Sequence, residues 1–211
     1  MSDNATLYYV HDPMCSWCWG FNPTLQQLKQ NLPESVEFKY LLGGLAADSV
    51  EPMPVAMQTF LQQTWRNIEQ EIPGTVFNFD FWTQCQPRRS TYPACRALIA
   101  ARNQSVEKSL AMIESIQLAY YTKALNPSDD LTLIGLADKL ELDLDQFRSD
   151  LNSEQTQSEL QQQIQFSRHL GVESFPSLVL QKNESLQGVS LDYLNATVML
   201  EEIEHCLEKQ N

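Results

Sequence analysis

Basic residues are scarce in this sequence, which has 14 Lys and Arg against 27 Asp and Glu among 211 residues and a formal net charge of −13. A protein that binds nucleic acid needs a cationic surplus to neutralise phosphates. The composition therefore argues against a nucleic-acid partner. The acidic balance is explained most simply by solubility, because like charges on the surface keep molecules apart.

Long apolar runs are also missing. No stretch approaches the roughly 20 apolar residues that a membrane-spanning helix needs, so no membrane association is expected. The opening residues MSDNATLYYV have neither the positive end nor the apolar length of a secretory signal. We therefore expect a cytoplasmic, globular protein. Its length suits one large domain, or a small domain that carries an insertion.

Cysteines are few and irregularly spaced. An odd number at irregular spacings argues against a structural disulfide framework. Two of them form a CxxC motif within HDPMCSWCWGF, directly after the apolar run LYYV. In a reducing compartment, such a close pair is more often catalytic or metal-binding than structural. The five cysteines are Cys15, Cys18, Cys85, Cys95 and Cys206.

Strand patterns are confined to the two ends of the chain. TLYYVHD predicts a buried strand, a helical apolar pattern runs from Cys18 to Leu32, and VEFKYLLGG predicts a second strand. Near the other end, VESFPSLVLQKNESLQGV predicts two short strands around the turn QKNES. An amphipathic helix from Asp192 to about Leu207 closes the chain. The CxxC motif therefore lies where the first strand meets its helix.

The middle third is predicted to be almost entirely helical, with helices beginning near Tyr92 and after Ser105. An earlier helix, VAMQTFLQQTWRNIEQEI, has an apolar stripe that includes Phe60 and Trp65. The exception is the alternation of Phe77, Phe79 and Phe81, which predicts an extended segment with three rings on one side. These rings either line a groove or pack the interior of the helical block.

Without this block, the order of elements is that of a thioredoxin fold. We therefore predict an α/β protein, a thioredoxin fold with an inserted helical domain. Residues 1–48 and 153–211 form the discontinuous thioredoxin-fold domain, and residues 49–152 form the insertion, which caps the CxxC motif. A CxxC motif in this context is typical of redox chemistry.

The two cysteines are predicted to have different roles. A thiolate attacks disulfides, and a helix N-terminus favours the thiolate through its unpaired N–H groups and positive dipole. Cys15 lies at that first turn and Cys18 lies one turn further in. We therefore predict that Cys15 is the nucleophile and the more exposed thiol, and that Cys18 is the resolving thiol.

Other interpretations of the pair are open but less favoured. A zinc site needs four ligands, and no second CxxC or HxxxH motif accompanies the pair. Two inert buried cysteines, or a metal or cluster site shared by two copies of the chain, are further alternatives. We expect no bound metal and no bound cofactor.

Three motifs carry a resemblance to a known family. DPMCSWCWGF, RSTYPACRALIAA and GVESFPSLVL, at these separations, resemble the DsbA-like branch of the thioredoxin superfamily, in particular its FrnE-like group of predicted protein disulfide isomerases. The resemblance spans nearly the whole chain. It implies that Phe175 and Pro176 form the cis-proline step that faces the CxxC motif and leaves backbone free for an extended substrate. Together with Trp17, these two are the expected substrate-binding residues.

The resemblance implies a thiol-disulfide oxidoreductase, a reductase or isomerase that acts on disulfide-containing proteins or peptides through a mixed disulfide, with glutathione as a redox partner. The same branch includes kappa-class glutathione transferases and hydroxychromene carboxylate isomerases, which use serine at the position of Cys15. A glutathione-dependent transferase or isomerase acting on a small molecule is therefore the alternative. A redox-inert binding module is a third interpretation.

Several residues near these motifs have two interpretations. His11 and Asp12 either tune Cys15 or simply end the strand. Cys85 and Cys95 are either ordinary buried cysteines or a second redox pair. The intervening segment QPRRSTYPA is expected to border the active-site groove, where its two arginines are either solvated or hold an anionic substrate such as glutathione.

Overall fold

A computed structural model describes residues 5–209. Residues 1–4 and 210–211, which the predicted domain limits include, lie outside this part. The described residues contain four strands and nine helices. The strands are β1 Ala5–His11, β2 Val36–Leu42, β3 Ser177–Lys182 and β4 Ser185–Val189. The helices are α1 Ser16–Gln30, α2 Val55–Glu71, α3 Phe81–Gln84, α4 Tyr92–Arg102, α5 Val106–Thr122, α6 Asp130–Lys139, α7 Leu144–Leu151, α8 Glu154–His169 and α9 Ala196–Lys209.

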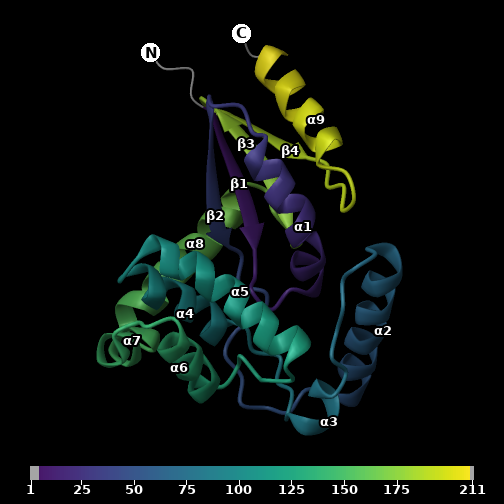
Figure 1. The fold of residues 1–211 in the computed structure, drawn as a ribbon. Coiled ribbons are helices and arrows are strands. Elements are labelled where there is room, and N and C mark those ends of the chain that lie inside the picture. Colours follow the sequence, from purple (N-terminus) through teal and green to yellow (C-terminus); the bar gives the residue numbers. More distant parts are fainter. Residues whose placement is uncertain (1–4, 210–211) are drawn as a thin grey trace.

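The four strands form one sheet in the order β2-β1-β3-β4 (Figure 1). β1 is parallel to β2 and antiparallel to β3, and β3 and β4 form an antiparallel hairpin. One face packs on α1 and α9 through a core that includes Leu7, Phe21 and Met199. The opposite face packs on a smaller cluster with Val10 and Leu170. This is the thioredoxin fold that the ends of the sequence predict.

The helices α2 to α7 lie between β2 and α8 in the sequence, within residues 49–152, which are predicted to form the insertion. α4 is the central helix of this block, because residues 93–101 are all buried and the helix contacts α5, α6, α7 and α8. Four of its residues are alanines, whose small side chains let neighbouring helices approach closely. The exact limits of the two domains stay a prediction of the sequence.

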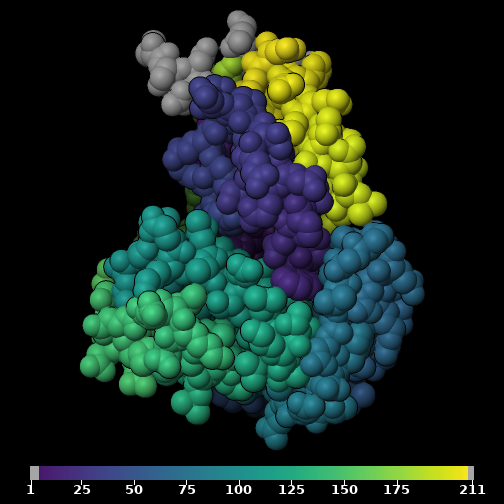
Figure 2. Space-filling model, in the orientation of Figure 1, coloured from purple at the N-terminus to yellow at the C-terminus, as the bar shows by residue number. Residues whose placement is uncertain are grey.

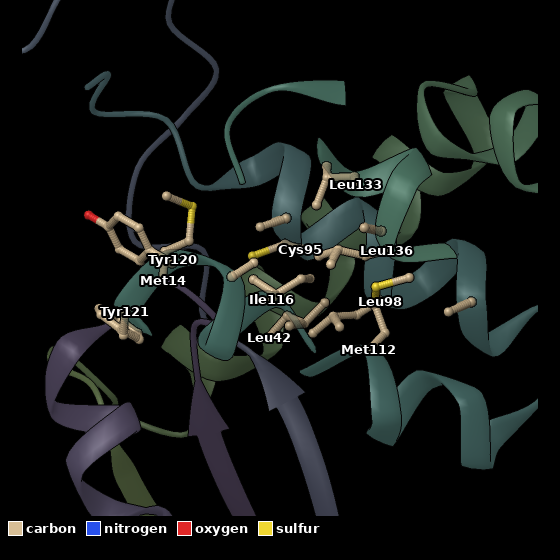
Figure 3. Close-up of a cluster of buried hydrophobic side chains, with 14 of the residues drawn as sticks. Met14, Leu42, Cys95, Leu98, Met112, Ile116, Tyr120, Tyr121, Leu133 and Leu136 are labelled. Carbon is tan, nitrogen blue, oxygen red and sulfur yellow. The ribbon is translucent and has the colours of Figure 1, made fainter. Parts of the chain in front are cut away.

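The interior of the helical block continues into the end of the sheet that carries the CxxC motif. Figure 3 shows Met14 and Leu42 in one cluster with Cys95, Ile116 and other side chains of the block. α2 contacts α1, and its Trp65 packs on Tyr120 and Tyr121 of α5. In Figures 1 and 2 the start of α1, in purple, lies between the blue α2 on one side and the teal helices on the other. The fold therefore places the CxxC motif at a junction between its two parts.

The prediction of an extended segment through Phe77 and Phe81 is wrong. Residues 75–78 are irregular, and the short helix α3 begins at Phe81. The three rings instead surround Trp65, with ring centroids 4.9 Å away for Phe77, 5.6 Å for Phe79 and 6.1 Å for Phe81. A turn followed by a helix can thus produce the alternation of a strand when every second ring packs on the same large neighbour. These rings belong to the interior of the block.

The last helix begins later than predicted, at Ala196 rather than at Asp192. The Asp192 carboxylate accepts hydrogen bonds from the backbone N–H groups of Leu194 and Asn195, both at 2.8 Å, which holds a turn before the helix. The Asn195 side chain then accepts from Thr197 N at 3.0 Å. The sequence correctly predicts Ser105 as the N-cap of α5. Within residues 5–209, no helix is both long and apolar enough to cross a membrane.

Candidate active site

Cys15 is the N-cap residue of α1. Its backbone N–H donates to the Asp12 carbonyl at 3.0 Å, and its carbonyl accepts from Trp19 N at 3.1 Å. The side chain therefore lies beside the unpaired N–H groups and the positive dipole of the first turn. Cys15 is 6% exposed and Cys18 is 0% exposed. The prediction that Cys15 is the more exposed thiol is confirmed.

The Cys15 thiol faces the residue that precedes the predicted cis-proline. Its Sγ donates to the Phe175 carbonyl at 3.4 Å. The peptide bond between Phe175 and Pro176 is cis, as predicted. The two segments are 160 residues apart in the sequence but meet because β1 and β3 are paired, with Val10 opposite Ser177. Phe175 is half-buried and Pro176 is buried.

A groove of about 380 Å³ opens beside Cys15. Trp17 and Phe175 both line it, whereas the buried Pro176 is not one of its lining residues. The facing wall is apolar and comes from α2 and the loop before it. It consists of Met53, Met57, Phe60 and Leu61. The sequence indicates an apolar stripe on α2, but only the structure shows that part of this stripe is turned toward the candidate nucleophile.

The segment before α4 also lines the groove, as predicted, through residues 88–91. The two arginines differ in their surroundings. Arg88 donates to the Asp129 carboxylate at 2.6 Å and to the Ser128 carbonyl at 2.7 Å. Within residues 5–209, Arg89 has no ion-pair partner. Arg88 thus holds α6 against the groove, while Arg89 is available to an anion in the groove.

Asp12 is fully buried and connects three segments of the site. One carboxylate oxygen accepts from Met14 N at 2.8 Å. The other accepts from Thr91 Oγ1 at 2.6 Å, Leu45 N at 2.7 Å and Cys95 Sγ at 3.5 Å. Burial raises the pKa of the Asp12 carboxyl, and the hydrogen bonds from Thr91 and the two N–H groups oppose that shift. Asp12 therefore fixes the CxxC loop to the helical block.

The His11 side chain is buried beside the rings of Tyr9 and Tyr40. Its ring stacks on Tyr9 with centroids 5.2 Å apart and meets Tyr40 edge-on at 5.5 Å. It lines a separate cavity of about 610 Å³, and not the groove beside the candidate nucleophile. Burial lowers the pKa of His11 from 6.5 to about 3. The imidazole is therefore neutral at pH 7.

The buried imidazole of His11 predicts that the folded protein loses stability as the pH falls. Between pH 6.5 and pH 3 the unfolded chain protonates His11 and the folded protein does not, so the free energy of unfolding falls as the pH falls. We expect His11 to account for at most about 3 kcal/mol of the loss between pH 6.5 and pH 4. The raised pKa of Asp12 acts in the opposite sense, but equally in the wild type and in a His11 variant.

Urea unfolding of the wild type and His11→Phe at pH 7 and pH 4 measures this contribution. The variant should lose less stability on acidification than the wild type. His205→Gln, which changes an exposed imidazole on α9, should behave as the wild type. An equal loss in the wild type and His11→Phe would contradict the prediction.

The remaining cysteines do not form a second pair within this structure. Cys85 Sγ donates to the Ala124 carbonyl at 3.1 Å, and burial raises the pKa of this thiol. Cys95 donates to Asp12 instead, and all five cysteines are free thiols. Cys206 packs on the core beneath α9. These contacts favour the interpretation of all three as packing residues.

Gly43, directly after β2, leaves room for the Phe175 ring. A Cβ at this position would lie 2.0 Å from a ring carbon of Phe175. Gly43→Ala is therefore expected to displace Phe175, with overpacking that lowers the free energy of unfolding by about 1–3 kcal/mol. It should also slow disulfide exchange, because Phe175 lines the groove and its carbonyl faces the Cys15 thiol.

The rate of disulfide exchange and the melting temperature test this expectation. Gly188→Ala on β4 is the matched control, because a Cβ there meets nothing within 4 Å. Exchange at the wild-type rate in folded Gly43→Ala would show that the position of Phe175 does not matter to the reaction.

The sheet order, the CxxC motif at the start of α1 and the cis-proline step facing it define a thioredoxin-fold protein. Residues 8–202 match the model of a family described as Thioredoxin. The chain belongs to this family.

Solved structures share this fold. A candidate protein disulfide isomerase from Nitrosomonas europaea is 23% identical, with 99% of this chain and 100% of that chain covered and a TM-score of 0.84. The cytosolic disulfide reductase DsbM from Pseudomonas aeruginosa is also 23% identical, with 97% and 99% covered and a TM-score of 0.75. DsbA from Pseudomonas aeruginosa is 13% identical, with 100% and 85% covered and a TM-score of 0.62.

The curated relatives have a different description. The ClpXP adapter protein SpxH of Bacillus subtilis is 24% identical over 173 residues, which is 82% of this chain and 56% of the relative. SpxH of Halalkalibacterium halodurans is 24% identical over 177 residues, with 82% and 57% covered. The chain thus spans a little over half the length of these curated relatives.

Proposed function

We propose that the protein is a thiol-disulfide oxidoreductase in which Cys15 attacks a substrate disulfide. The observation that carries this proposal is the position of the Cys15 sulfur, at the N-cap of α1, on the groove and facing the Phe175 carbonyl. A helix N-terminus stabilises the thiolate that performs the attack. Cys18, one turn further along α1, is buried beneath the surface and is reached from within the protein.

The reaction transfers two electrons from the protein to the substrate. The Cys15 thiolate attacks one substrate sulfur, a bond between the two sulfurs forms, and the other substrate sulfur leaves as a thiolate with the electron pair. Cys18 releases its proton to solvent and attacks Cys15, which forms the disulfide between the two cysteines and frees the second substrate thiolate. Two molecules of an external thiol such as glutathione return the two electrons and leave joined as a disulfide.

We propose reduction or isomerisation as the net direction in a cytoplasmic setting, because the glutathione poise there favours dithiols. The name of DsbM, a cytosolic disulfide reductase with the same fold, supports this direction. No bound cofactor or metal is needed for the exchange steps, since the two cysteines and an external thiol supply all the electrons.

The proposed substrates are disulfides in proteins or peptides. Phe175 carries a backbone carbonyl beside the reacting sulfur, which is where an extended chain forms hydrogen bonds. The apolar wall of the groove, with the 64%-exposed Phe60, suits apolar side chains beside the substrate cysteine. Trp17 closes the groove on the side of the cysteines and packs on Tyr193 with centroids 5.2 Å apart.

Glutathione is the proposed small-molecule partner. A structure of DsbM with glutathione has this fold, and Arg89 places an unpaired guanidinium on the groove, where it suits a glutathione carboxylate. The alternative of a glutathione-dependent transferase or isomerase uses the same groove, but such an enzyme has no use for Cys18.

Reduction of a model protein disulfide at a controlled glutathione potential tests the function. The wild type should reduce the substrate, and Cys15→Ser should abolish the activity because serine cannot form the mixed disulfide. Cys206→Ser, on α9, is the matched control and should retain full activity. An inactive wild type, or an active Cys15→Ser variant, would refute the proposal.

A second candidate function is protein binding without redox chemistry, which the curated relatives favour because they are named as adapter proteins. The same two variants distinguish it. An adapter should bind its protein partner equally well with Cys15→Ser, whereas the oxidoreductase loses its covalent intermediate.

A further inference from the structure

The cavity of about 610 Å³ that His11 lines is separate from the groove beside Cys15, and the two share no lining residue. It lies between β2 and the helices α4 and α5, and Figure 1 shows α5 crossing the end of the sheet next to β2. Its volume is typical of sites that hold a small molecule. Most of the side chains that line it are apolar or aromatic, and the aliphatic ones include Leu41, Leu98, Ile99, Val106, Leu110 and Ile113.

The charged side chains of this cavity are mainly basic, although the chain as a whole has a net charge of −13. Lys29, Lys39 and Arg102 line the cavity, and Glu159 is the single acid among its described lining residues. Glu159 forms an ion pair with Arg102, and Lys39 pairs with Glu37. Within residues 5–209, the Lys29 ammonium is therefore the one charge of this cavity without an oppositely charged partner.

Aromatic neighbours hold the Lys29 ammonium in place. Its Nζ lies 4.9 Å from the ring centroid of Tyr40 and 5.2 Å from that of Phe38. It donates a hydrogen bond to the Tyr40 hydroxyl at 2.9 Å. These partners fix the position of the ammonium but supply no formal negative charge. A carboxylate on a ligand would supply it through a charge-assisted hydrogen bond.

His11 is a buried polar side chain that also opens onto this cavity. It is 2% exposed and makes no side-chain hydrogen bond within residues 5–209. Its nitrogens are not among the fully enclosed atoms that lack a partner, so they are reached from the cavity. An imidazole always has at least one N–H to donate. Because its ring centroid lies 5.5 Å from that of Tyr40, this donor and the Lys29 ammonium border the same ring.

A further cavity continues from the first between α1 and α5. The residues that line both are His11, Lys29, Tyr40, Leu110 and Ile113. The walls of this second cavity carry more polar side chains, which include Asn22, Gln26, Glu114 and Gln117. The unpaired ammonium and the unpaired imidazole thus lie at the junction of an apolar cavity and a more polar one. An amphipathic molecule fits this arrangement.

We propose that the cavity binds a small amphipathic anion, a single acyl chain with a free carboxylate such as a medium-chain fatty acid. The acyl chain lies along the apolar walls from β2, α4 and α5, and the carboxylate accepts hydrogen bonds from Lys29 and His11. Burial of the chain contributes most of the affinity, and the carboxylate fixes the orientation of the ligand. This binding is independent of the function proposed above, because the cavity shares no residue with the groove beside Cys15.

Isothermal titration calorimetry of the full chain with decanoate, below its micelle concentration, measures this binding directly. The wild type should bind one decanoate per chain. Butanoate should bind at least about a hundredfold more weakly, since each buried methylene contributes roughly fourfold to the affinity. Decyltrimethylammonium has a chain of similar length with the opposite charge, and it should not bind at concentrations at which decanoate saturates the protein. Absence of decanoate binding, or equal binding of the decyl cation, would overturn the proposal.

Two variants then locate the site. Lys29→Gln should weaken decanoate binding by about 10- to 100-fold, the effect of losing a hydrogen bond between charged groups, and should leave binding of the uncharged decanol unchanged. Lys139→Gln, which changes an exposed lysine on α6, is the matched control and should bind decanoate as the wild type does. Leu110→Trp enlarges a 40%-exposed side chain that lines both cavities, and it should abolish binding of decanoate and decanol alike.

The melting temperature and the rate of disulfide reduction should stay at the wild-type values in both variants, which shows that the fold and the groove beside Cys15 are intact. Wild-type affinity for decanoate in Lys29→Gln or in Leu110→Trp would overturn the site. An equal loss of decanol and decanoate binding in Lys29→Gln would overturn the role of the ammonium.

Discussion

Cys18→Ser should convert the protein into a trap that stays covalently linked to its substrate through Cys15. In the proposed reaction, the buried Cys18 thiol attacks this mixed disulfide from within the protein. Well-oriented intramolecular reactions have effective molarities of about 10⁵ M or more, far above any external thiol concentration. We therefore expect release of the substrate to slow by at least about a thousandfold.

Mass spectrometry of the variant after incubation with a peptide disulfide measures this outcome directly. With two identical peptide chains joined by one disulfide, the adduct should have the mass of the protein plus one peptide chain, and a reducing agent should remove it. The double variant Cys15→Ser/Cys18→Ser should form no adduct, although it retains Cys85, Cys95 and Cys206. An adduct that disappears from Cys18→Ser as fast as from the wild type would show that Cys18 is not the resolving thiol.

The second large effect concerns the stability of the helical block. Trp65 on α2 is 1% exposed and lies among six aromatic rings, the nearest of which have centroids 4.9 Å away. Trp65→Ala should lower the free energy of unfolding by about 3–5 kcal/mol, because it removes a fully buried tryptophan side chain and leaves a cavity. The neighbouring rings are Phe77, Phe79, Phe81, Trp82, Tyr120 and Tyr121.

Urea unfolding followed by circular dichroism measures this loss. Phe60→Ala is the matched control on the same helix, since its ring is 64% exposed and should contribute about 0.5 kcal/mol or less. Phe60→Ala should instead weaken binding of apolar peptide disulfides, because this ring lines the groove. A loss below about 1 kcal/mol for Trp65→Ala would contradict the account of this cluster as the interior of the block.

The apolar stripe on α2 shows that a sequence pattern can be predicted correctly while the contacts of its residues cannot. Both Trp65 and Phe60 belong to one apolar stripe on α2, and hydrophobic periodicity identifies that stripe without showing what covers each part of it. In the structure, Trp65 packs inside the block while Phe60 faces the groove. For Phe77 and Phe79 the pattern itself misleads. Their alternation is typical of a strand, but in the structure both rings pack on Trp65 in the interior of the block.

By itself, the sequence determined the features that depend on neighbouring residues. The CxxC motif after a buried strand, the helix that follows it, the Ser105 cap and the β3–β4 hairpin are all short-range patterns, and the order of elements was enough to predict the thioredoxin fold. The cis-proline step was predicted through resemblance, which also depends on short motifs.

Only the tertiary structure decided which distant groups meet. The Phe175 carbonyl reaches Cys15 because β1 and β3 pair, Asp12 meets Thr91 because α4 packs on the CxxC loop, and Tyr9 packs on Phe21 because α1 covers β1. These contacts join residues across up to 160 positions in the chain. Side-chain contacts at such separations are set by the packing of whole elements, which no local periodicity records.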